Sequence, residues 1–364
     1  MRIVHLSTVH RTRDNRIYNK ECGGLLSDGY DVRLVVRAEH DENDPVPIAA
    51  LPAPRNRIQR LTLTQLQAWR KLNSLRPDLL HIHDPELIPM ARLWGSRHKV
   101  AWIFDAHEHL VDQIDTKPYL KPWQRRAAKA YAAWLTRQAD QHADGIVAAT
   151  ERIADQYRNR NVGVVHNYPW LRDFVNEPAP VPGRLVYTGD LTEERRFSFM
   201  VQVAHRLREM VDHAHLVLAG SFRGRSGISL QGSIDGDVVR HLGLLPPAQV
   251  PDVIASASVG LIFLDPLPNY LTSLPTKVFE YMASSVPFAA SDFAHWKASF
   301  GTHEAGIFVD SSDAQAAATA LASIITDPTR LASMGRAGRL AVEQYYNFEG
   351  ELDQLLTVVE RAVG

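Results

Sequence analysis

Two groups of polar side chains follow apolar runs in the first half of the chain. LLHIHD ends in His81, His83 and Asp84, and VAWIFDAHEH ends in a cluster that contains Asp105 and His107. The apolar runs are typical of buried parallel strands, and the carboxyl ends of such strands lie at one edge of a sheet. Imidazole and carboxylate groups that meet there could exchange protons, stabilise developing charge or bind a metal ion.

A segment in the second half, Ser273–Phe293, has residue types that suit an anionic ligand. Pro275 predicts a helix start, and apolar residues then recur at helical spacing before the apolar strand VPFAA. Glu280 lies on the polar face, about a turn and a half behind that start. Free N–H groups at the start could bind a diphosphate, and the carboxylate could accept hydrogen bonds from ribose hydroxyls. The alternative is an ordinary surface ion pair between Glu280 and Lys277.

The elements that must position these residues alternate between strand and helix along the chain. Strand patterns such as MRIVHLS and DVRLVV alternate with helical ones, and a proline-rich stretch at 176–183 interrupts the series once. After it, the alternation begins again with RLVYTGD. This organisation predicts an α/β protein with two doubly wound, Rossmann-like parallel sheets, in domains at 1–178 and 184–345.

The loop after the first strand, Thr8–Arg16, contains no glycine. A dinucleotide site at this end of the fold would need a glycine-rich turn, so we do not expect one. The loop contains charged residues instead, among them Arg13, Asp14 and Arg16. They either contact a ligand or belong to a solvated surface loop, and the residue types alone favour neither.

The composition limits the classes of function. The chain has 364 residues, a formal net charge of −1, and 45% hydrophobic and 22% charged residues, as in an ordinary globular protein. The near-zero charge gives no basic field for nucleic acid, and Cys22, the single cysteine, excludes an internal disulfide. No apolar run approaches the ~20 residues that a membrane span needs. We therefore expect a soluble, cytoplasmic protein without a nucleic-acid partner.

The segment Ser273–Phe293 resembles the nucleotide-binding segment of the retaining glycosyltransferases of family 4. That family usually carries two glutamates eight positions apart across this segment. Here the second is Glu280, and Thr272 occupies the position of the first. Subgroups with a PxK-containing helix start and only the second acid are similar to this chain, and the DNRIYNKE run resembles a subgroup signature. The resemblance covers nearly the whole chain and is closest over residues 235–300.

This resemblance implies the GT-B fold, in which two such domains face each other across a cleft and the second binds the nucleotide. Residues 346–364 would then form a helix that returns to pack on the first domain. The implied reaction moves a sugar from a nucleotide-diphosphate donor to an acceptor hydroxyl, with retention of configuration and without a metal ion or other cofactor. The acceptor would be a glycan, a lipid-linked molecule or a small molecule, as in polysaccharide or glycoconjugate biosynthesis.

The same resemblance implies a set of site residues. His107 would lie beside the transferred sugar, while Arg196 and Lys277 would neutralise the departing diphosphate. The donor would contact Gly189, Arg195, Gly220, Leu242, Ser273, Leu274, Pro275, Thr276 and Glu280. The acceptor side would present Arg13, Asp14, Arg16 and Glu108. The alternative for the two arginines is surface pairing with the neighbouring glutamates, Glu193 and Glu194.

Two other functions are compatible with the residues. A metal-dependent hydrolase could take ligands from His81, His83, Asp84 and His107, although a strand histidine is often a core residue. A nucleotide-sugar-binding protein that has lost catalysis would account for Thr272 in place of the first glutamate. Metal analysis and product analysis would separate these functions from glycosyl transfer.

The helical pattern of Lys117–His142 carries six Lys or Arg residues between Tyr119, Trp123, Tyr131 and Trp134. This composition could hold the protein on an anionic membrane surface, at its inner face and near a lipid-linked acceptor. The interpretation that we favour is an amphipathic helix that packs its aromatic side chains on the sheet.

Overall fold

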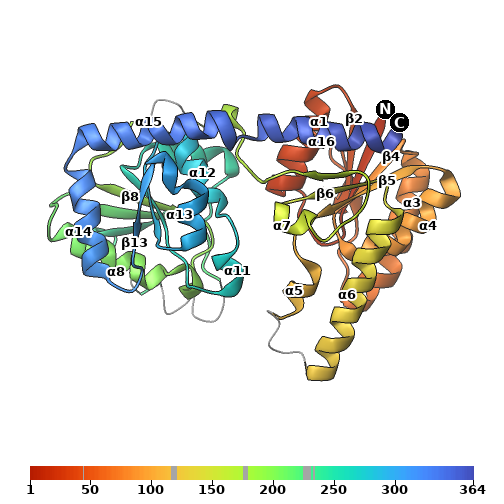
Figure 1. Cartoon of the computed structure of the whole chain (residues 1–364), viewed down its shortest axis with the longest axis horizontal. Helices are drawn as coiled ribbons and strands as arrows, with labels where there is room; N and C mark the ends of the chain where they lie inside the picture. Colours follow the sequence, from red (N-terminus) through yellow and green to blue (C-terminus); the bar gives the residue numbers. More distant parts are fainter. Residues whose placement is uncertain (44, 116–120, 175–178, 224–230, 233) are drawn as a thin grey trace. The chain divides into compact units, whose positions relative to one another are not determined.

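The computed structural model describes residues 1–364 except 44, 116–120, 175–178, 224–230 and 233. Contacts divide the chain into two compact units: unit 1, residues 1–167 with 348–364, and unit 2, residues 168–347. Each unit contains one parallel sheet covered by helices (Figure 1). The alternation of strand and helix thus produces the two doubly wound sheets that the sequence predicts.

The sheet of unit 1 has the strand order β3-β2-β1-β4-β5-β6-β7, and all neighbouring strands run parallel. Its strands are β1 Arg2–Leu6, β2 Asp31–Arg37, β3 Ile48–Leu51, β4 Leu79–Ile82, β5 Ala101–Ala106, β6 Gly145–Ala148 and β7 Val162–Val164. The order reverses between β1 and β4. The loops after these two strands therefore lie at the switch point, where doubly wound folds bind ligands.

The helical segments of unit 1 cover this sheet. They are η1 Asn15–Cys22, α1 Gly23–Ser27, α2 Arg57–Gln59, η2 Arg60–Thr64, α3 Gln65–Leu75, η3 Pro85–Leu87, α4 Ile88–His98, α5 Leu110–Asp115, α6 Pro122–His142, α7 Glu151–Ala154 and α16 Phe348–Val363. The first of them, η1, is π-helical. Its N-cap is Asp14, whose carboxylate accepts hydrogen bonds from the amides of Arg16 and Ile17.

The terminal helix α16 packs closely on β6 and β7 of unit 1. A Cβ atom at Gly163 would lie 2.4 Å from a methyl group of Val358, and one at Gly145 would lie 2.9 Å from the other. Asn161 Nδ2 also donates a hydrogen bond to the Val358 carbonyl over 2.9 Å. The helix can approach the sheet this closely because both strand positions lack a side chain.

The sheet of unit 2 has the order β10-β9-β8-β11-β12-β13 and is also parallel. Its strands are β8 Arg184–Thr188, β9 His215–Ala219, β10 Val239–His241, β11 Val259–Ile262, β12 Phe288–Ser291 and β13 Gly306–Val309. The switch point here lies between β8 and β11. Both units therefore repeat one architecture without a repeat in residue identity.

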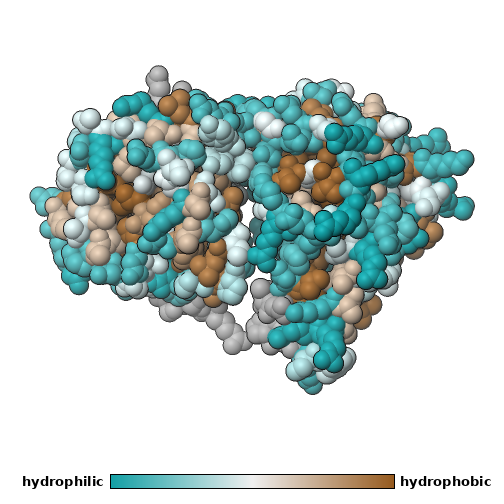
Figure 2. Space-filling view, in the orientation of Figure 1, coloured by the Kyte–Doolittle hydropathy of each residue, from teal (hydrophilic) through white to brown (hydrophobic). Residues whose placement is uncertain are grey.

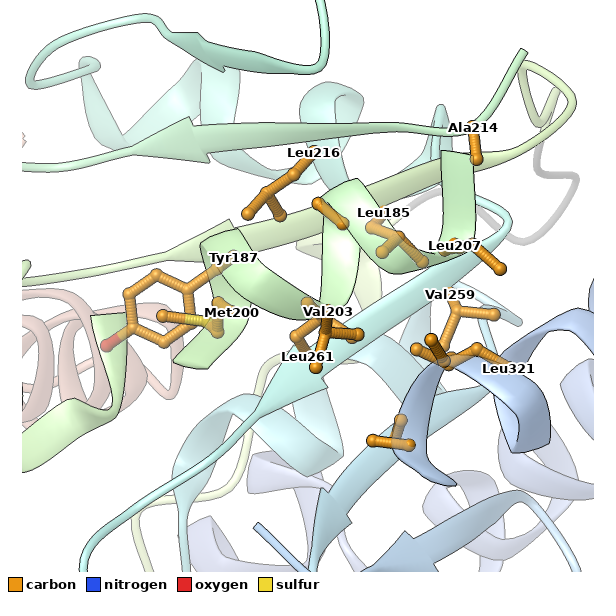
Figure 3. Close-up of a cluster of buried hydrophobic side chains, with 14 of the residues drawn as sticks. Leu185, Tyr187, Met200, Val203, Leu207, Ala214, Leu216, Val259, Leu261 and Leu321 are labelled. Atoms are coloured by element: carbon orange, nitrogen blue, oxygen red, sulfur yellow. The ribbon is translucent and has the colours of Figure 1, made fainter. Parts of the chain in front are cut away.

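Helices on the two faces of this sheet bury separate apolar clusters. The helical segments are η4 Leu171–Asp173, η5 Glu193–Arg195, α8 Phe197–Arg208, η6 Pro247–Gln249, α10 Val250–Ala255, α11 Pro268–Leu271, α12 Thr276–Ala283, α13 Ala294–Phe300, η7 Gly301–His303, α14 Ala314–Ile325 and α15 Pro328–Tyr345. Figure 3 shows the first cluster, in which Met200 and Leu207 of α8 and Leu321 of α14 meet strand residues such as Leu185 and Leu261. On the other face, α12 packs against α15.

Two features of the fold differ from the sequence prediction. β3 lies in a stretch where the sequence predicted no element, because its four residues sit between prolines; an edge position in the sheet tolerates such flanks. The division between the units falls after Asn167, ahead of the proline-rich stretch at 176–183, part of which lies outside the described residues.

Candidate active site

Asp84 holds the loop that follows β1 at the switch point of unit 1. Its buried carboxylate accepts hydrogen bonds from the amide of Thr8 over 2.5 Å, from Ser7 Oγ over 3.0 Å and from the amide of Val9 over 3.2 Å. The side chain makes no capping hydrogen bond to the helical segment that follows it. A carboxylate with this many donors fixes the backbone of the loop.

This fixed loop places His10 beside His107, with 5.1 Å between the ring centroids. His10 Nδ1 lies 3.1 Å from the Asp14 carboxylate. Burial alone would raise the pKa of Asp14, but the hydrogen bond with His10 lowers it to about 2. Burial alone would lower the pKa of His10, but Asp14 raises it. The sequence analysis missed His10, although its place after the first strand put it near the switch point.

His107, the predicted sugar-side residue, is oriented from behind by Asp105. His107 Nε2 lies 2.9 Å from Asp105 Oδ2, and Arg16 Nη2 lies 2.9 Å from Asp105 Oδ1. His83 Nδ1 lies 3.0 Å from the same carboxylate. Burial would raise the pKa of Asp105, but Arg16 and His107 hold it well below its ordinary value. The carboxylate therefore stays ionised and directs the other ring nitrogen of His107 away from itself.

Arg16 is not on the surface of the acceptor-side loop, which corrects the expectation that it faces an acceptor. Its side chain is almost fully buried, and its guanidinium also donates to the Val165 carbonyl over 2.7 Å and lies 2.9 Å from Glu21 Oε1. The buried carboxylates of Glu21 and Asp105 need a buried cation. The sequence shows only that Arg16 is a charged residue in a loop, and it does not show that this residue is buried. Arg13 is exposed and pairs with Glu42, and Glu108 is exposed.

Three histidines stack in the core behind this site. His5, His81 and His83 are fully or nearly fully buried, and the rings of His81 and His83 stack with centroids 4.9 Å apart. Burial lowers the pKa of His5 and of His81, and burial with the Asp105 charge raises the pKa of Glu21. Burial therefore disfavours the charged forms of these histidines and of Glu21, whereas Arg16 pairs with both carboxylates and favours their ionised forms.

Metal-ligand atoms come together in this core. Within the described residues, one group has ligand atoms that all lie within 4.8 Å of one another: Glu21, His81, His83 and Asp105. It shares His81 and His83 with the predicted ligand set, but Glu21 and Asp105 take the places of His107 and of Asp84, which binds the loop after β1. Arg16 already supplies a positive charge to both carboxylates, which weakens the case for a cation.

Two glycines shape the carboxyl edge of the sheet in unit 2. Gly189 and Gly220 follow β8 and β9 with φ of 133° and 151°. A Cβ atom at Gly220 would lie 1.8 Å from the Gly189 carbonyl oxygen, and one at Gly189 would lie 2.7 Å from Cε of Lys277. Both positions therefore require glycine, and the loop backbone lies directly beside the Lys277 side chain.

Two cations at this edge, Arg195 and Lys277, form no ion pair with any described acidic residue. Arg195 Nη1 donates to Tyr187 Oη over 3.4 Å, and Lys277 Nζ lies 5.9 Å from the centroid of the same ring. Burial lowers the pKa of Lys277, and the charge of Glu280 opposes this effect only in part.

Arg196 differs from these two cations because its charge is already balanced. Its Nη1 lies 3.2 Å from Asp265 Oδ1, and the guanidinium also donates to the carbonyl of Ser311. The alternative pairing of the two arginines with Glu193 and Glu194 is not formed among the described ion pairs. Among the described residues, Arg195 and Lys277, rather than Arg196 and Lys277, are therefore the cations at this edge that form no ion pair.

Helix α12 begins at the same edge, with Pro275 as its N-cap residue. Its apolar face is buried, as the sequence predicts, and the carbonyl of Ser273 ahead of it accepts a hydrogen bond from Trp296 over 2.8 Å. Glu280 is half-buried and, among the described residues, has no hydrogen bond or ion pair, so the predicted alternative pairing with Lys277 is absent. Thr272 Oγ1 bonds to the carbonyl of Pro268.

The remaining predicted donor residues lie on the same edge. Leu274 and Thr276 flank the start of α12 and are half-buried, whereas Leu242, after β10, is 47% exposed. His241 Nε2 lies 2.8 Å from the Gly220 carbonyl oxygen. The loops after β8, β9 and β10 and the start of α12 therefore gather eight of the nine predicted donor positions at one end of the sheet of unit 2, and the ninth, Glu280, lies one turn further along α12.

The aromatic residues of α6 do not pack on the sheet, which makes the interpretation favoured from the sequence wrong. Trp123, Tyr131 and Trp134 are 69%, 51% and 41% exposed, and the buried side of the helix consists of smaller residues. Alanines on that side bring α6 close to its neighbours, so there is no room beneath it for indole rings. Among the described helices, none combines the length and apolar composition needed to cross a bilayer.

Comparison with family models matches both units. Residues 19–167 match the glycosyl transferase 4-like domain, and residues 182–327 match glycosyl transferases group 1. No curated protein matches the chain.

Solved structures show the same fold at low sequence identity. Sucrose-phosphate synthase from Thermosynechococcus elongatus aligns with a TM-score of 0.72 and 18% identity, over 99% of this chain and 98% of that one. Anabaena Alr3699/HepE in complex with UDP-glucose gives 0.72 and 11%, over 99% of each chain. A glycosyltransferase from Rickettsia africae gives 0.71 and 10%, over 100% and 98%. With both domain models matched and this fold, the chain belongs to the glycosyltransferases of group 1 with a 4-like first domain and the GT-B fold.

Proposed function

We propose that this protein transfers a hexose or related sugar from a nucleotide-diphosphate donor to an acceptor hydroxyl, with retention of configuration and without a metal ion. The observation that carries the proposal is a set of charged groups at one edge of unit 2, Arg195, Lys277 and Glu280, that form no ion pair within the described part of the chain. Anabaena Alr3699/HepE was crystallised with UDP-glucose, so a UDP-hexose is the first donor to test. Retention follows from the family resemblance.

The diphosphate would occupy the start of α12, where the first amides have no partner within the helix. Arg195 and Lys277 would neutralise it, and the missing side chains at Gly189 and Gly220 would let it approach the loop backbone. Burial lowers the pKa of Lys277, because little water reaches its ammonium group. A bound diphosphate would supply the negative charge that stabilises the charged form of this group. Glu280 would accept hydrogen bonds from the ribose.

His107 would act on the sugar through Nδ1, because Asp105 engages Nε2. A hydrogen bond at Nδ1 would orient a sugar hydroxyl or stabilise charge near the anomeric carbon. The neighbouring pair of His10 and Asp14 would face the acceptor hydroxyl, together with Arg13 and Glu108. Arg16 would act only through Asp105, as a positioning residue.

Calorimetric titration with UDP, GDP and the matching monophosphates tests the donor site. Arg195→Ala and Lys277→Ala should each weaken diphosphate binding about 10- to 150-fold, as for other hydrogen bonds to charged groups, and affect monophosphates less. Arg196→Ala is the matched control, since its charge is balanced by Asp265. Unchanged affinity for every nucleoside diphosphate in both variants would remove the proposed donor site.

Turnover measurements test the role of His107. His107→Ala should lower kcat about 100-fold, in the range seen when one preorganised donor is removed, while UDP affinity stays at the wild-type value. Equal turnover in the variant would exclude the assignment. Donor binding by the wild type without any transfer or hydrolysis would instead identify a binding protein, the alternative raised by Thr272.

A metal-dependent hydrolase is the second candidate, because Glu21, His81, His83 and Asp105 have the spacing of a metal-ligand group. Metal analysis of the purified protein, with and without a chelator, decides this question. Stoichiometric zinc or manganese whose removal abolishes activity would support the hydrolase. Activity that survives the chelator would leave the glycosyltransferase.

A further inference from the structure

Helix α6 presents a row of aromatic side chains to solvent. Trp123 and Trp134 are separated by eleven residues and, at 100° per residue, lie within about 20° of each other on the helix. Tyr131 stacks on Trp134 with ring centroids 5.7 Å apart. Single exposed apolar residues are common and are scattered over a protein surface. Three large exposed aromatic side chains on one face of a helix are not scattered, and they indicate an interaction surface.

Cations accompany this aromatic row. Lys121, at the N-cap, and Arg125, Arg126, Lys129 and Arg137 in α6 are basic, and the one acid of the helix is Asp140. Arg126 and Arg137 are exposed, and the 100° spacing puts both on the same side of the aromatic row, about 40–60° from Trp123. In the described part of the chain, neither forms an ion pair.

Asp140 bonds to backbone amides, and among the described residues it forms no ion pair with Arg126 or Arg137. It accepts hydrogen bonds from the amides of Arg158 over 2.5 Å and Asn159 over 2.8 Å. In Figure 2, hydrophilic side chains follow α6 along much of its length. The exposed face of α6 therefore combines indole and phenol rings with two arginines, Arg126 and Arg137, that form no ion pair among the described residues.

We propose that this face of α6 docks the protein on an anionic lipid bilayer. Trp and Tyr rings suit the headgroup region, where one end is apolar and the other wet, and the arginines match lipid phosphates. An acidic protein partner would account for the arginines of this face, but it would not account for the two exposed indole rings beside them. A lipid headgroup region accounts for both. The proposal stands independently of the sugar donor and the acceptor.

Vesicle co-flotation of the full chain tests this surface. Vesicles of phosphatidylcholine with a minor share of phosphatidylglycerol should bind the protein, vesicles of phosphatidylcholine alone should bind it weakly, and salt should reduce binding. Arg126→Gln with Arg137→Gln should lower the partition coefficient about 25-fold, from about 1 kcal/mol for each arginine near an anionic surface. Trp123→Ala with Trp134→Ala should lower it at least about tenfold, through the lost apolar contact.

Matched controls come from exposed residues of unit 2. Arg206→Gln, with a side chain 53% exposed, and Tyr345→Ala, at 61%, should bind vesicles like the wild type. Thermal unfolding of each variant shows whether it is folded. Equal binding to neutral and anionic vesicles, or wild-type binding by the tryptophan pair, would overturn the proposal.

Two further results would assign the face of α6 to another occupant. If the protein bound millimolar inorganic phosphate at this face but did not bind anionic vesicles, the face would be an anion site rather than a membrane surface. Concentration-dependent self-association without lipid, lost in the tryptophan pair, would indicate a second copy of the chain. Either result would overturn docking on lipid.

Discussion

The carboxyl edges of the two sheets share one topology but treat charge in opposite ways. In unit 1 the Asp105 carboxylate is fully buried and is contacted by Arg16, His83 and His107. In unit 2 Lys277 and Glu280 lie at the corresponding edge, and among the described residues neither has an ion-pair partner. The charges at the edge of unit 1 are balanced by other protein groups, whereas those of Lys277 and Glu280 at the edge of unit 2 form no ion pair among the described residues.

This difference separates two ways of building a site. The groups of unit 1 hold one another in a single geometry, so they are suited to orient a reacting group such as His107. On the proposed function, the charges of unit 2 would gain most of their interaction energy when a nucleotide binds. Substitutions of the buried charged groups behind His107 should therefore mainly change folding stability, and those of the charges in unit 2 mainly ligand affinity.

The largest expected effect is at Arg16. Arg16→Met leaves two buried carboxylates without their cation and should lower the free energy of unfolding by about 3–5 kcal/mol. Arg13→Met, in the exposed pair with Glu42, should cost at most about 1 kcal/mol. Denaturant unfolding measures the loss of stability in each variant, and hydrogen exchange of the β5 amides measures it locally. Equal losses in the two variants would contradict the contrast between a buried and an exposed pair.

Glu280 gives the next largest effect, and it concerns binding rather than folding. Glu280→Ala should weaken UDP or GDP binding by about 1.5–3 kcal/mol, the range for hydrogen bonds to a charged group, and should leave the unfolding transition in place. Glu209→Ala, on the exposed end of α8, is the control. Calorimetry supplies the affinities. Wild-type affinity in the Glu280 variant would place the ribose elsewhere.

The sequence predicted the frame of both sites because parallel strands have a strong signature. β4 and β12 are buried along their length, and the polar residues that follow apolar runs do gather at one edge. His81 lies in β4 and His83 directly after it, and their rings stack in the core, where strand histidines are often found. The partnership with Glu21 and Arg16 depends on tertiary packing between separate elements, which no local pattern encodes.

The side of a helix that meets the core was harder to predict. In α6 the large aromatic residues made the stronger apolar signal, yet Ala132, Leu135 and Ala139 form the buried side. Close packing favours small residues where helices approach each other, so the largest apolar side chains of α6 do not mark its buried side. The same limit applies to Arg196 and Arg195: the sequence shows two adjacent cations, and only the fold shows that Asp265 balances one of them.

The smallest predicted effect tests whether a partnered group of unit 1 stabilises the unit through its charge. His166 Nδ1 lies 3.1 Å from Glu351 of α16, and Nε2 lies 3.2 Å from Glu151. Burial alone would lower the pKa of His166, but Glu351 and Glu151 raise it. A raised pKa means that this stability is fully present below the unfolded value of about 6.5 and is lost as pH rises through the folded value.

Raising the pH from 6 to 9 should therefore reduce the free energy of unfolding of unit 1 through this group. Glu351→Gln removes the main cause of the raised pKa and should flatten that part of the profile. Glu360→Gln, on the exposed side of the same helix, should retain the wild-type slope. Hydrogen exchange of the α16 and β7 amides across this pH range provides the measurement. A slope that persists in Glu351→Gln would show that the pair holds the helix through hydrogen bonds alone, and that unit 1 uses charge for geometry rather than for stability.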